Sequence, residues 1–406
     1  MNDNLRTSCR LAALSLAAII AAGCSGAQPS PTARSTSSQF APSQVTLALV
    51  HGRLIDGTGA APIADATVLI AGDRIVAAGS AAATSVPSGV QTVDIKGATI
   101  LPGFINAHVH DAFSTSNLQA WAKGGVTTVR DESAPAQQVE GLKALKAQIA
   151  ADPTLARLVS MGSMLKSPGG YGQREVTSAD DARRVVLDEI ADGVDGIKIA
   201  NEDGYAGQTG LPKLTADELE AIISTAHANG LPVSGHITQG ANMMTLLQAG
   251  VDDIAHAPYD YLPPEALQWM VDHRTFIEPT FSVYKSFGLS LFQLEQNVGR
   301  LSGAGVRIAL GNDYDGGGTG EYELGIPMVE IEEMAASGMT PMQIIQASTR
   351  NGAQLLKIDS LVGTIETGKS ADILVVAGDP LADLQALRNV RLVVHGGRII
   401  RDEFAG

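Results

Sequence analysis

Short apolar segments alternate with amphipathic stretches through the middle of the chain. The apolar segments are rich in β-branched residues, which is typical of buried strands, and they cover 103–109, 126–130, 158–161, 196–200, 232–236, 253–256, 275–279 and 306–311. Stretches with apolar residues at helical spacing lie between them, for example 178–191, 215–229 and 264–273. Strands that alternate with helices in this way predict an α/β fold, a (β/α)8 TIM-type barrel over residues 101–357.

The pattern changes on both sides of this middle region. Strand-like runs separated by turn residues cover 45–50, 53–55, 66–71, 74–78 and 91–95 before it, and 371–376 and 391–394 after it. The sequence of residues 395–400 also echoes that of residues 51–55. We therefore predict that residues 44–100 and 358–406 combine into one small β-sandwich domain.

The first 43 residues show neither pattern. Arg6 and Arg10 precede an apolar run over residues 11–22, which is too short for a permanent membrane span and has the form of a cleaved signal peptide over residues 1–23. The sequence Ala-Ala-Gly-Cys that ends at Cys24 resembles a bacterial lipobox, which implies a lipidated cell-envelope lipoprotein, or a secreted protein if Cys24 is unmodified. Residues 24–43 are rich in Ser, Thr, Pro and Ala and are expected to form a flexible tether.

Charge and cysteine content narrow the classes of function. The formal net charge is −15, so the protein should repel nucleic acid and anionic membrane surfaces, and membrane contact is expected through the lipid anchor only. The only cysteines, Cys9 and Cys24, stand near the N-terminus. A disulfide, a thiolate metal site and a cysteine nucleophile are therefore excluded from the folded body. Association into a homo-oligomer stays open.

Polar residues stand where the predicted strands end, and TIM barrels keep their active sites at the carboxyl ends of their strands. His108 and His110 are two apart on one strand, so their side chains point the same way and can hold one ion. Four further strands each add one residue to the same rim: Lys198, His236, His256 and Asp313. Imidazoles and a carboxylate suit zinc or a similar divalent ion, and a set this large favours two ions.

These residues lie in longer motifs. The motifs are Leu-Pro-Gly-Phe-Ile-Asn-Ala-His-Val-His (101–110), Gly-Val-Thr-Thr-Val-Arg-Asp (125–131), Asp-Gly-Ile-Lys-Ile (195–199), Gly-Val-Asp-Asp-Ile-Ala-His (250–256), Leu-Gly-Asn-Asp (310–313) and Val-Gly-Thr-Ile-Glu-Thr-Gly-Lys-Ser-Ala-Asp (362–372). In this order they resemble the amidohydrolase superfamily, and within it the members similar to Xaa-Pro dipeptidases and imidazolonepropionase. The resemblance implies a binuclear centre. Its first ion would be held by His108, His110 and Asp313, its second by His236 and His256, and Lys198, carboxylated by CO2, would bridge both.

The reaction implied by this resemblance is hydrolysis of an amide bond in a dipeptide or an N-acyl amino acid. Two cations that share a water lower its pKa and supply hydroxide, while one cation polarises the scissile carbonyl. Asp313 is the candidate proton shuttle to the leaving amine, and Asp315, two positions on, competes for that role. An ordinary ion pair of Lys198 with Asp195 or Glu202 competes with the carbamate.

Three residues are candidate substrate contacts. Tyr171 follows two glycines at a place where similar proteins often carry histidine, and it offers a hydroxyl and a flat apolar face. Arg130 and Arg174, with Lys166 and Lys213 nearby, predict a positive rim that attracts a substrate carboxylate. Internal ion pairs of these cations, and a packed Tyr171, are the alternatives.

Other functions remain open on the same residues. A lactone, ester or cyclic amide would suit the same metal site. A mononuclear deaminase is disfavoured because such enzymes generally carry a glutamate three residues after the fifth-strand histidine, where this chain has Gln239. A non-catalytic binding lipoprotein is disfavoured because all six candidate ligands are present.

Overall fold

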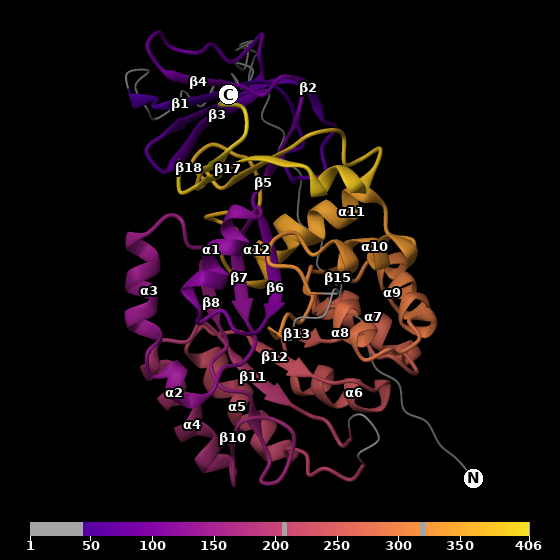
Figure 1. Cartoon of the computed structure of the whole chain (residues 1–406). Helices are drawn as coiled ribbons and strands as arrows, with labels where there is room; N and C mark the ends of the chain where they lie inside the picture. The colour runs from indigo at the N-terminus through magenta and orange to yellow at the C-terminus, as the bar shows by residue number, and fades with distance from the viewer. Residues whose placement is uncertain (1–43, 205–208, 317–321, 406) are drawn as a thin grey trace, which may run out of the picture. The chain divides into compact units, whose positions relative to one another are not determined.

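The computed structural model describes residues 44–204, 209–316 and 322–405 (Figure 1). The predicted signal peptide, tether and lipidation site Cys24 lie outside the described residues. Among those residues, every helix is too short or too polar to cross a lipid bilayer.

Both ends of the described chain contribute strands to one mixed sheet. Its strands run in the order β18-β17-β16-β5-β1-β2-β3, and β4 also pairs with β1. Their bounds are β1 (Leu47–Leu54), β2 (Ile63–Ala71), β3 (Arg74–Ser80), β4 (Gln91–Asp94), β5 (Thr99–Pro102), β16 (Ile373–Val376), β17 (Val390–His395) and β18 (Arg398–Asp402). Antiparallel pairing of β16 with β5 brings the yellow strands of Figure 1 beside the indigo ones. Alternate residues of these strands, such as Leu47 and Leu49, share one buried core with Val375.

The middle region contains two parallel sheets. One has the order β6-β7-β8 and the other β10-β9-β11-β12-β13-β14-β15. The bounds are β6 (Phe104–Val109), β7 (Val126–Asp131), β8 (Arg157–Ser160), β9 (Leu165–Lys166), β10 (Arg174–Glu175), β11 (Ile197–Ala200), β12 (Val233–His236), β13 (Asp253–Ala255), β14 (Phe276–Glu278) and β15 (Arg307–Ile308). Each predicted strand region of the middle of the chain contains one of these strands. The short strands β9 and β10 were not predicted.

Helices separate the parallel strands, as the sequence predicts. They are α1 (Thr115–Lys123), α2 (Ala136–Val139), α3 (Leu142–Ala151), α4 (Ala179–Asp192), α5 (Ala216–Ala228), α6 (Gly240–Ala249), α7 (Pro264–His273), α8 (Phe281–Ser286), α9 (Phe292–Ala304), α10 (Met328–Ala336), α11 (Pro341–Gln346) and α12 (Gly352–Leu355), with a π-helical turn η2 (Ala347–Asn351) and a 3-10 helix η3 (Leu384–Arg388). The start of α5 shows why the boundaries fall where they do. Thr215 and Glu218 form a capping box that satisfies otherwise unpaired backbone N–H groups.

Backbone hydrogen bonds connect β6 to the segment that follows β15. Ala107 N donates to Leu310 O at 2.7 Å, Asp313 N to His108 O at 2.9 Å and His110 N to Tyr314 O at 2.6 Å. A similar bond, from Asp195 N to Ser160 O at 2.8 Å, links the segment before β11 to the last residue of β8. The bonds of β6 and His110 fix the backbone of Asp313 beside His108, which lies in β6, and His110, which directly follows it.

Candidate metal centre

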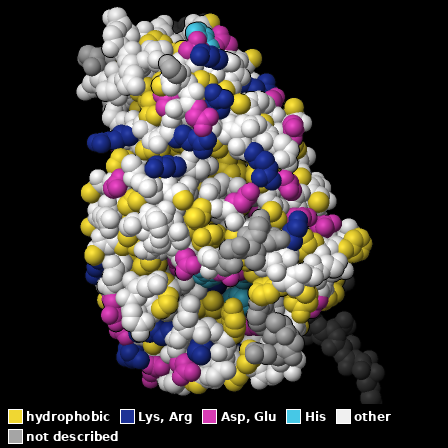
Figure 2. All heavy atoms as spheres, viewed as in Figure 1, with side chains coloured by type: hydrophobic (Ala, Val, Ile, Leu, Met, Phe, Trp, Pro, Cys, Tyr) yellow, Lys and Arg dark blue, Asp and Glu magenta, His cyan; other side chains and the backbone are white. Residues whose placement is uncertain are grey.

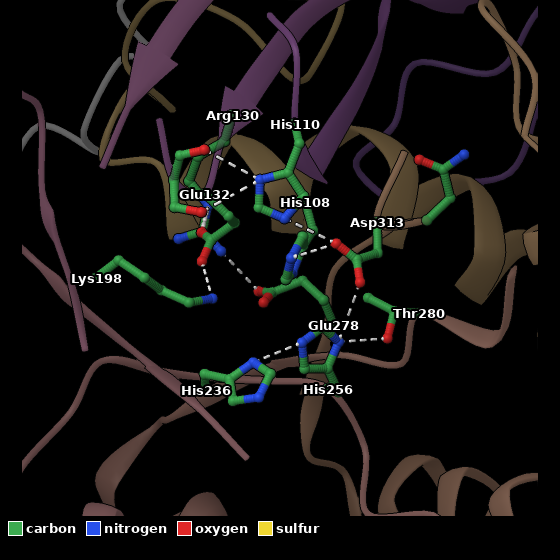
Figure 3. Close-up of polar contacts among 12 residues, drawn as sticks. His108, His110, Arg130, Glu132, Lys198, His236, His256, Glu278, Thr280 and Asp313 are labelled. Atoms are coloured by element: carbon green, nitrogen blue, oxygen red, sulfur yellow. Dashed lines mark hydrogen bonds and ion pairs between the residues drawn. The ribbon is translucent and has the colours of Figure 1, made fainter. Parts of the chain in front are cut away.

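Five of the six predicted metal ligands lie in one cluster, which we call the histidine cluster: His108, His110, His236, His256 and Asp313 (Figure 3). One oxygen of Asp313, Oδ1, lies 3.1 Å from His108 Nε2 and 3.0 Å from His110 Nε2. One potential ligand atom each of His108, His256 and Asp313 lie within 4.8 Å of one another. The sequence predicts that residues at the carboxyl ends of strands lie together. The cluster contains such residues although His108 and Asp313 are 205 positions apart in the sequence.

Hydrogen bonds from outside the cluster orient its imidazoles. His110 Nδ1 lies 3.1 Å from the backbone oxygen of Ser133, so Nδ1–H donates and Nε2 faces Asp313. The Thr280 hydroxyl donates to Pro279 O, and its oxygen therefore accepts from His256 Nδ1–H at 2.7 Å. His256 Nε2 then accepts from His236 Nδ1 at 2.9 Å. Such second contacts are how proteins aim metal-binding imidazoles.

Burial and charge keep His108, His236 and Asp313 in the protonation states that metal binding needs, whereas His110 holds a proton that an ion would displace. Burial lowers the pKa of His108 to about 4 against the pull of Asp313, and burial lowers the pKa of His236 to about 3, so both rings are neutral at pH 7. Burial would raise the pKa of Asp313, but the neighbouring His108 and His110 hold it well below its ordinary value.

Two buried nitrogens, His108 Nδ1 and His236 Nε2, have no hydrogen-bond partner among the described residues. Neutral imidazoles, a carboxylate and unpartnered buried nitrogens fit a divalent ion of the zinc type.

Three residues at these strand ends have a left-handed backbone that non-glycine residues rarely adopt. The φ angles are 73° for His256, 55° for Thr280 and 54° for Asp313. Each such conformation costs about 1–3 kcal/mol and persists only where the surroundings hold it. All three residues belong to the cluster or contact it. The side-chain contacts of the cluster therefore hold the backbone in conformations that are unfavourable by themselves.

The sixth predicted ligand, Lys198, is fully buried and forms an ion pair with Glu132. Glu132 also accepts a hydrogen bond from Ser234 Oγ at 2.9 Å. The alternative partners named from the sequence are both wrong. Asp195 pairs with Lys146 at 2.6 Å, and Glu202 accepts from the backbone and hydroxyl of Thr238. Lys198 points inward because it lies within β11, whereas those two carboxylates lie outside the strand.

The structure places Arg130 in internal ion pairs, which is the alternative to a substrate contact that the sequence left open. Its side chain is 1% exposed, with Nη2 3.0 Å from Asp253 Oδ2 and 3.2 Å from Glu278 Oε1, and Nε 2.6 Å from Glu132 Oε1. These carboxylates hold the buried guanidinium, which offsets their charge. Burial opposes this charge, but Asp253, Glu132 and Glu278 raise the pKa of Arg130 above its ordinary value.

The positive rim is also not formed as predicted. Arg174 directs its guanidinium at α4, with Nη1 2.7 Å from Glu189 Oε1 and Nη2 3.0 Å from Asp188 Oδ2. The other two predicted rim cations are paired as well: Lys166 with Glu175 at 3.7 Å and Lys213 with Asp203 at 3.4 Å. Arg174 lies in β10, which pairs with β9.

Sequence reasoning missed Glu132, Asp253 and Glu278. Glu278 ends β14, the seventh strand, for which the strand-end rule named no residue. Glu132 directly follows β7, next to the motif that ends at Asp131. Both positions satisfied the rule that found the ligands, so the signal was present in the sequence.

A cavity of about 520 Å³ adjoins the cluster and is lined by His110, Tyr171, Met164, Leu211, Gln138 and Gln173 among others. Its lining among the described residues holds no Lys or Arg. The Tyr171 ring stacks on His236, with ring centroids 4.6 Å apart, so this candidate contact stands between cavity and ligands. Figure 2 shows histidine side chains at the base of a hollow in the lower half of the molecule.

Comparison with known proteins agrees with this geometry. The model of the amidohydrolase family matches residues 99–400. Ochratoxinase from Aspergillus niger is 27% identical over 271 residues, which are 60% of this chain and 55% of that protein, so the chain spans about half the length of this relative.

Two further matches span more of both chains. Imidazolonepropionase from Caulobacter vibrioides is 24% identical over 364 residues, 77% of this chain and 88% of that protein. A solved Xaa-Pro dipeptidase with bound methionine in its active site is similar at a TM-score of 0.77 and 25% identity, over 87% of this chain and 99% of that chain. It has the same TIM-type α/β fold. The chain described here belongs to the amidohydrolase family.

Proposed function

We propose that this protein is a metal-dependent hydrolase that cleaves an amide bond. The observation that carries the proposal is the convergence of ligand atoms from His108, His256 and Asp313 within 4.8 Å of one another. His110 contacts Asp313 and His236 contacts His256, so both residues belong to the same set. Membership of the amidohydrolase family supports the reaction class.

The centre that we propose holds two divalent ions, most simply zinc. His108, His110 and Asp313 would hold the first ion, His236 and His256 the second, and Lys198 would bridge them as a carbamate. Support comes from the position of Lys198, whose charge lowers the pKa of His236 after the larger effect of burial. Formation of the carbamate requires the Lys198 amine to leave Glu132, its present partner.

The ions would lower the pKa of a water and polarise the scissile carbonyl. The protein would supply the proton transfers. Asp313 takes a proton from the attacking water and gives it to the leaving nitrogen, and its position 3.0–3.1 Å from two imidazoles keeps the carboxylate aimed at the cluster. Asp315, the competitor for this role, has an exposed side chain.

The cavity beside the cluster supports an uncharged or apolar substrate group. Met164, Leu211 and the face of Tyr171 offer apolar surface, while Gln138 and Gln173 offer neutral hydrogen-bonding groups. The predicted carboxylate clamp loses its support, because Arg130 and Arg174 are paired internally. A dipeptide or N-acyl amino acid with an apolar side chain remains the proposed substrate. Asp111 is the one carboxylate in this lining among the described residues, and the absence of a Lys or Arg beside it favours a neutral lactone or ester as the second candidate.

The test compares kcat/KM for an N-acyl amino acid with that for its carboxamide, using metal-loaded protein. Without a cation in the cavity lining, we expect the two values to agree within about threefold. A drop of about tenfold or more for the carboxamide, about 1.4 kcal/mol of transition-state binding, would restore a carboxylate clamp. Hydrolysis of neutral lactones or aryl esters in preference to both would select the second candidate.

Three further proposals complete this account. The hydrogen bonds between β6 and the segment after β15 support one closed (β/α)8 barrel, and the shared core of both chain ends supports a separate β-sandwich domain. The N-terminal sequence supports an exported lipoprotein whose residues 1–23 are removed and whose Cys24 is lipidated. Mass spectrometry of the N-terminal peptide from membrane-extracted protein, with Cys24→Ser as the control, tests the last of these.

A further inference from the structure

A second cavity, of about 360 Å³, lies at the amino ends of β14 and β15, the opposite ends of these strands from the histidine cluster. Three arginines line it: Arg274, which ends α7, Arg307, the first residue of β15, and Arg350 in η2. Ser302 and Asn351 add neutral polar groups. Its lining among the described residues contains no Asp or Glu. We call it the arginine cavity.

The arginines of this cavity differ from most others in the described chain. Arg157 pairs with Asp372 at 2.9 Å and Arg388 with Glu323 at 3.2 Å, as expected in a protein of net charge −15. In residues 44–204, 209–316 and 322–405, no carboxylate forms an ion pair with Arg274, Arg307 or Arg350. Like charges thus gather around one cavity without their counter-charge.

Local contacts hold two of these side chains in place while leaving donors unused. The Arg307 guanidinium lies 3.9 Å from the centre of the Phe276 ring and donates to the backbone oxygen of Arg274. Arg350 Nη1 donates to Thr58 O at 2.6 Å. The Nε atoms of Arg307 and Arg350 are buried and have no partner among the described residues. Burial lowers the pKa of Arg307, and repulsion from the charge of Arg274 lowers it further.

We propose that the arginine cavity binds a small oxyanion of the phosphate type, free or as a phosphate monoester. Guanidinium groups match such oxyanions through paired N–H···O bonds, and buried unpaired donors gain most from them. A doubly charged oxyanion offsets several arginines, whereas a monocarboxylate offsets one. The surrounding negative charge of the protein would confine anion binding to this cavity. The proposal is independent of the proposed hydrolase.

The test is calorimetric titration of the purified protein with inorganic phosphate at constant ionic strength, with chloride as the background anion. Arg307→Gln removes one of the three cations and keeps a hydrogen-bonding side chain, so we expect the affinity to fall about tenfold or more. Arg300→Gln is the matched control, because Arg300 is an exposed arginine of α9 outside the cavity lining. That variant should bind phosphate within about twofold of the unchanged protein.

A second variant covers the case in which Arg307→Gln fails to fold. Arg274 is exposed, so Arg274→Gln should keep the fold and weaken phosphate binding several-fold. Phosphate also binds metal ions, so binding that both cavity variants leave unchanged would place it at the metal centre and overturn the proposal. Absence of binding at ~10 mM phosphate would do the same. Acetate that binds as tightly as phosphate would overturn the phosphate-type class of ligand.

Discussion

Two groups of polar side chains meet inside the parallel strands, and they differ in how their charges are balanced. The first is the histidine cluster. The second, which we call the ion-pair network, consists of Arg130, Glu132, Lys198, Asp253 and Glu278. The network supplies two cations, Arg130 and Lys198, which form ion pairs with its three carboxylates, although Glu132 Oε1 and both oxygens of Glu278 make no hydrogen bond among the described residues. In the cluster, His108 and His236 are neutral and each has one buried nitrogen without a hydrogen-bond partner among the described residues, while His110 carries the proton that its contact with Asp313 favours.

This difference separates a structural from a chemical role. A buried ion pair adds little net stability to the folded state. Removal of one partner nevertheless lowers the free energy of unfolding strongly, because it leaves the other charge buried and unpaired. A cluster of neutral ligands around a carboxylate gains most when a cation binds. We therefore expect substitutions in the cluster to change chemistry first, and substitutions in the network to change stability first.

The largest expected effect is that of Asp313→Asn. The amide cannot take up and release the proton, so turnover should fall by about 10²–10⁴-fold while the thermal midpoint stays close to that of the unchanged protein. Turnover with the best substrate and thermal unfolding measure the two quantities. Asp315→Asn is the control, since Asp315 is exposed and two positions away. Loss of activity in the control alone would assign the shuttle to Asp315.

The ion-pair network is tested by Arg130→Met. The change leaves three buried carboxylates without their shared cation and should lower the free energy of unfolding by about 3–5 kcal/mol in urea titrations. Arg183→Met is the control. It breaks an exposed pair with Asp180 on α4 and should cost less than about 1 kcal/mol. Equal stability of the two variants would show that the network is not structural.

A smaller effect concerns pH in metal-free protein. Burial opposes protonation of His110, but its hydrogen bond to Asp313 raises the pKa to about 9 from the ordinary 6.5. The folded protein thus keeps a proton that the unfolded chain releases. This contribution to stability is full below pH 6.5 and is lost as pH rises through about 9.

His110→Gln should remove this alkaline loss, which we expect to be on the order of 1–2 kcal/mol because the side chain is partly exposed. Urea unfolding of chelator-treated protein at pH 6 and pH 9.5 gives the comparison. If the variant loses as much stability as the unchanged protein over that interval, the pair of His110 with Asp313 does not form without metal.

The histidine cluster was predictable because one rule covers it. Strand ends of a TIM-type fold converge, so His236 and His256 could be assigned to one site although 20 positions separate them in the sequence. The rule says which end of a strand a residue occupies but not how deep it lies. Arg130 lies within β7 rather than beyond its end. Its side chain is therefore buried, although the sequence predicts a place at the rim.

Two errors have a different cause. Arg174 belongs to β10, a strand of two residues, and no periodicity can be read from so short a segment. The partners predicted for Lys198 are its neighbours in the sequence, whereas its partner Glu132 directly follows β7, a strand of the other parallel sheet. Pairing across the interior depends on register and tilt between strands, which hydrophobic patterning does not specify.

The histidine cluster and Lys198 are proposed to form together a centre for two ions. This proposal can be checked by the metal content per chain, measured by plasma mass spectrometry on protein loaded with zinc and bicarbonate. We expect two ions per chain in the unchanged protein and loss of one or both in Lys198→Ala. A single tightly bound ion that Lys198→Ala leaves in place would contradict it.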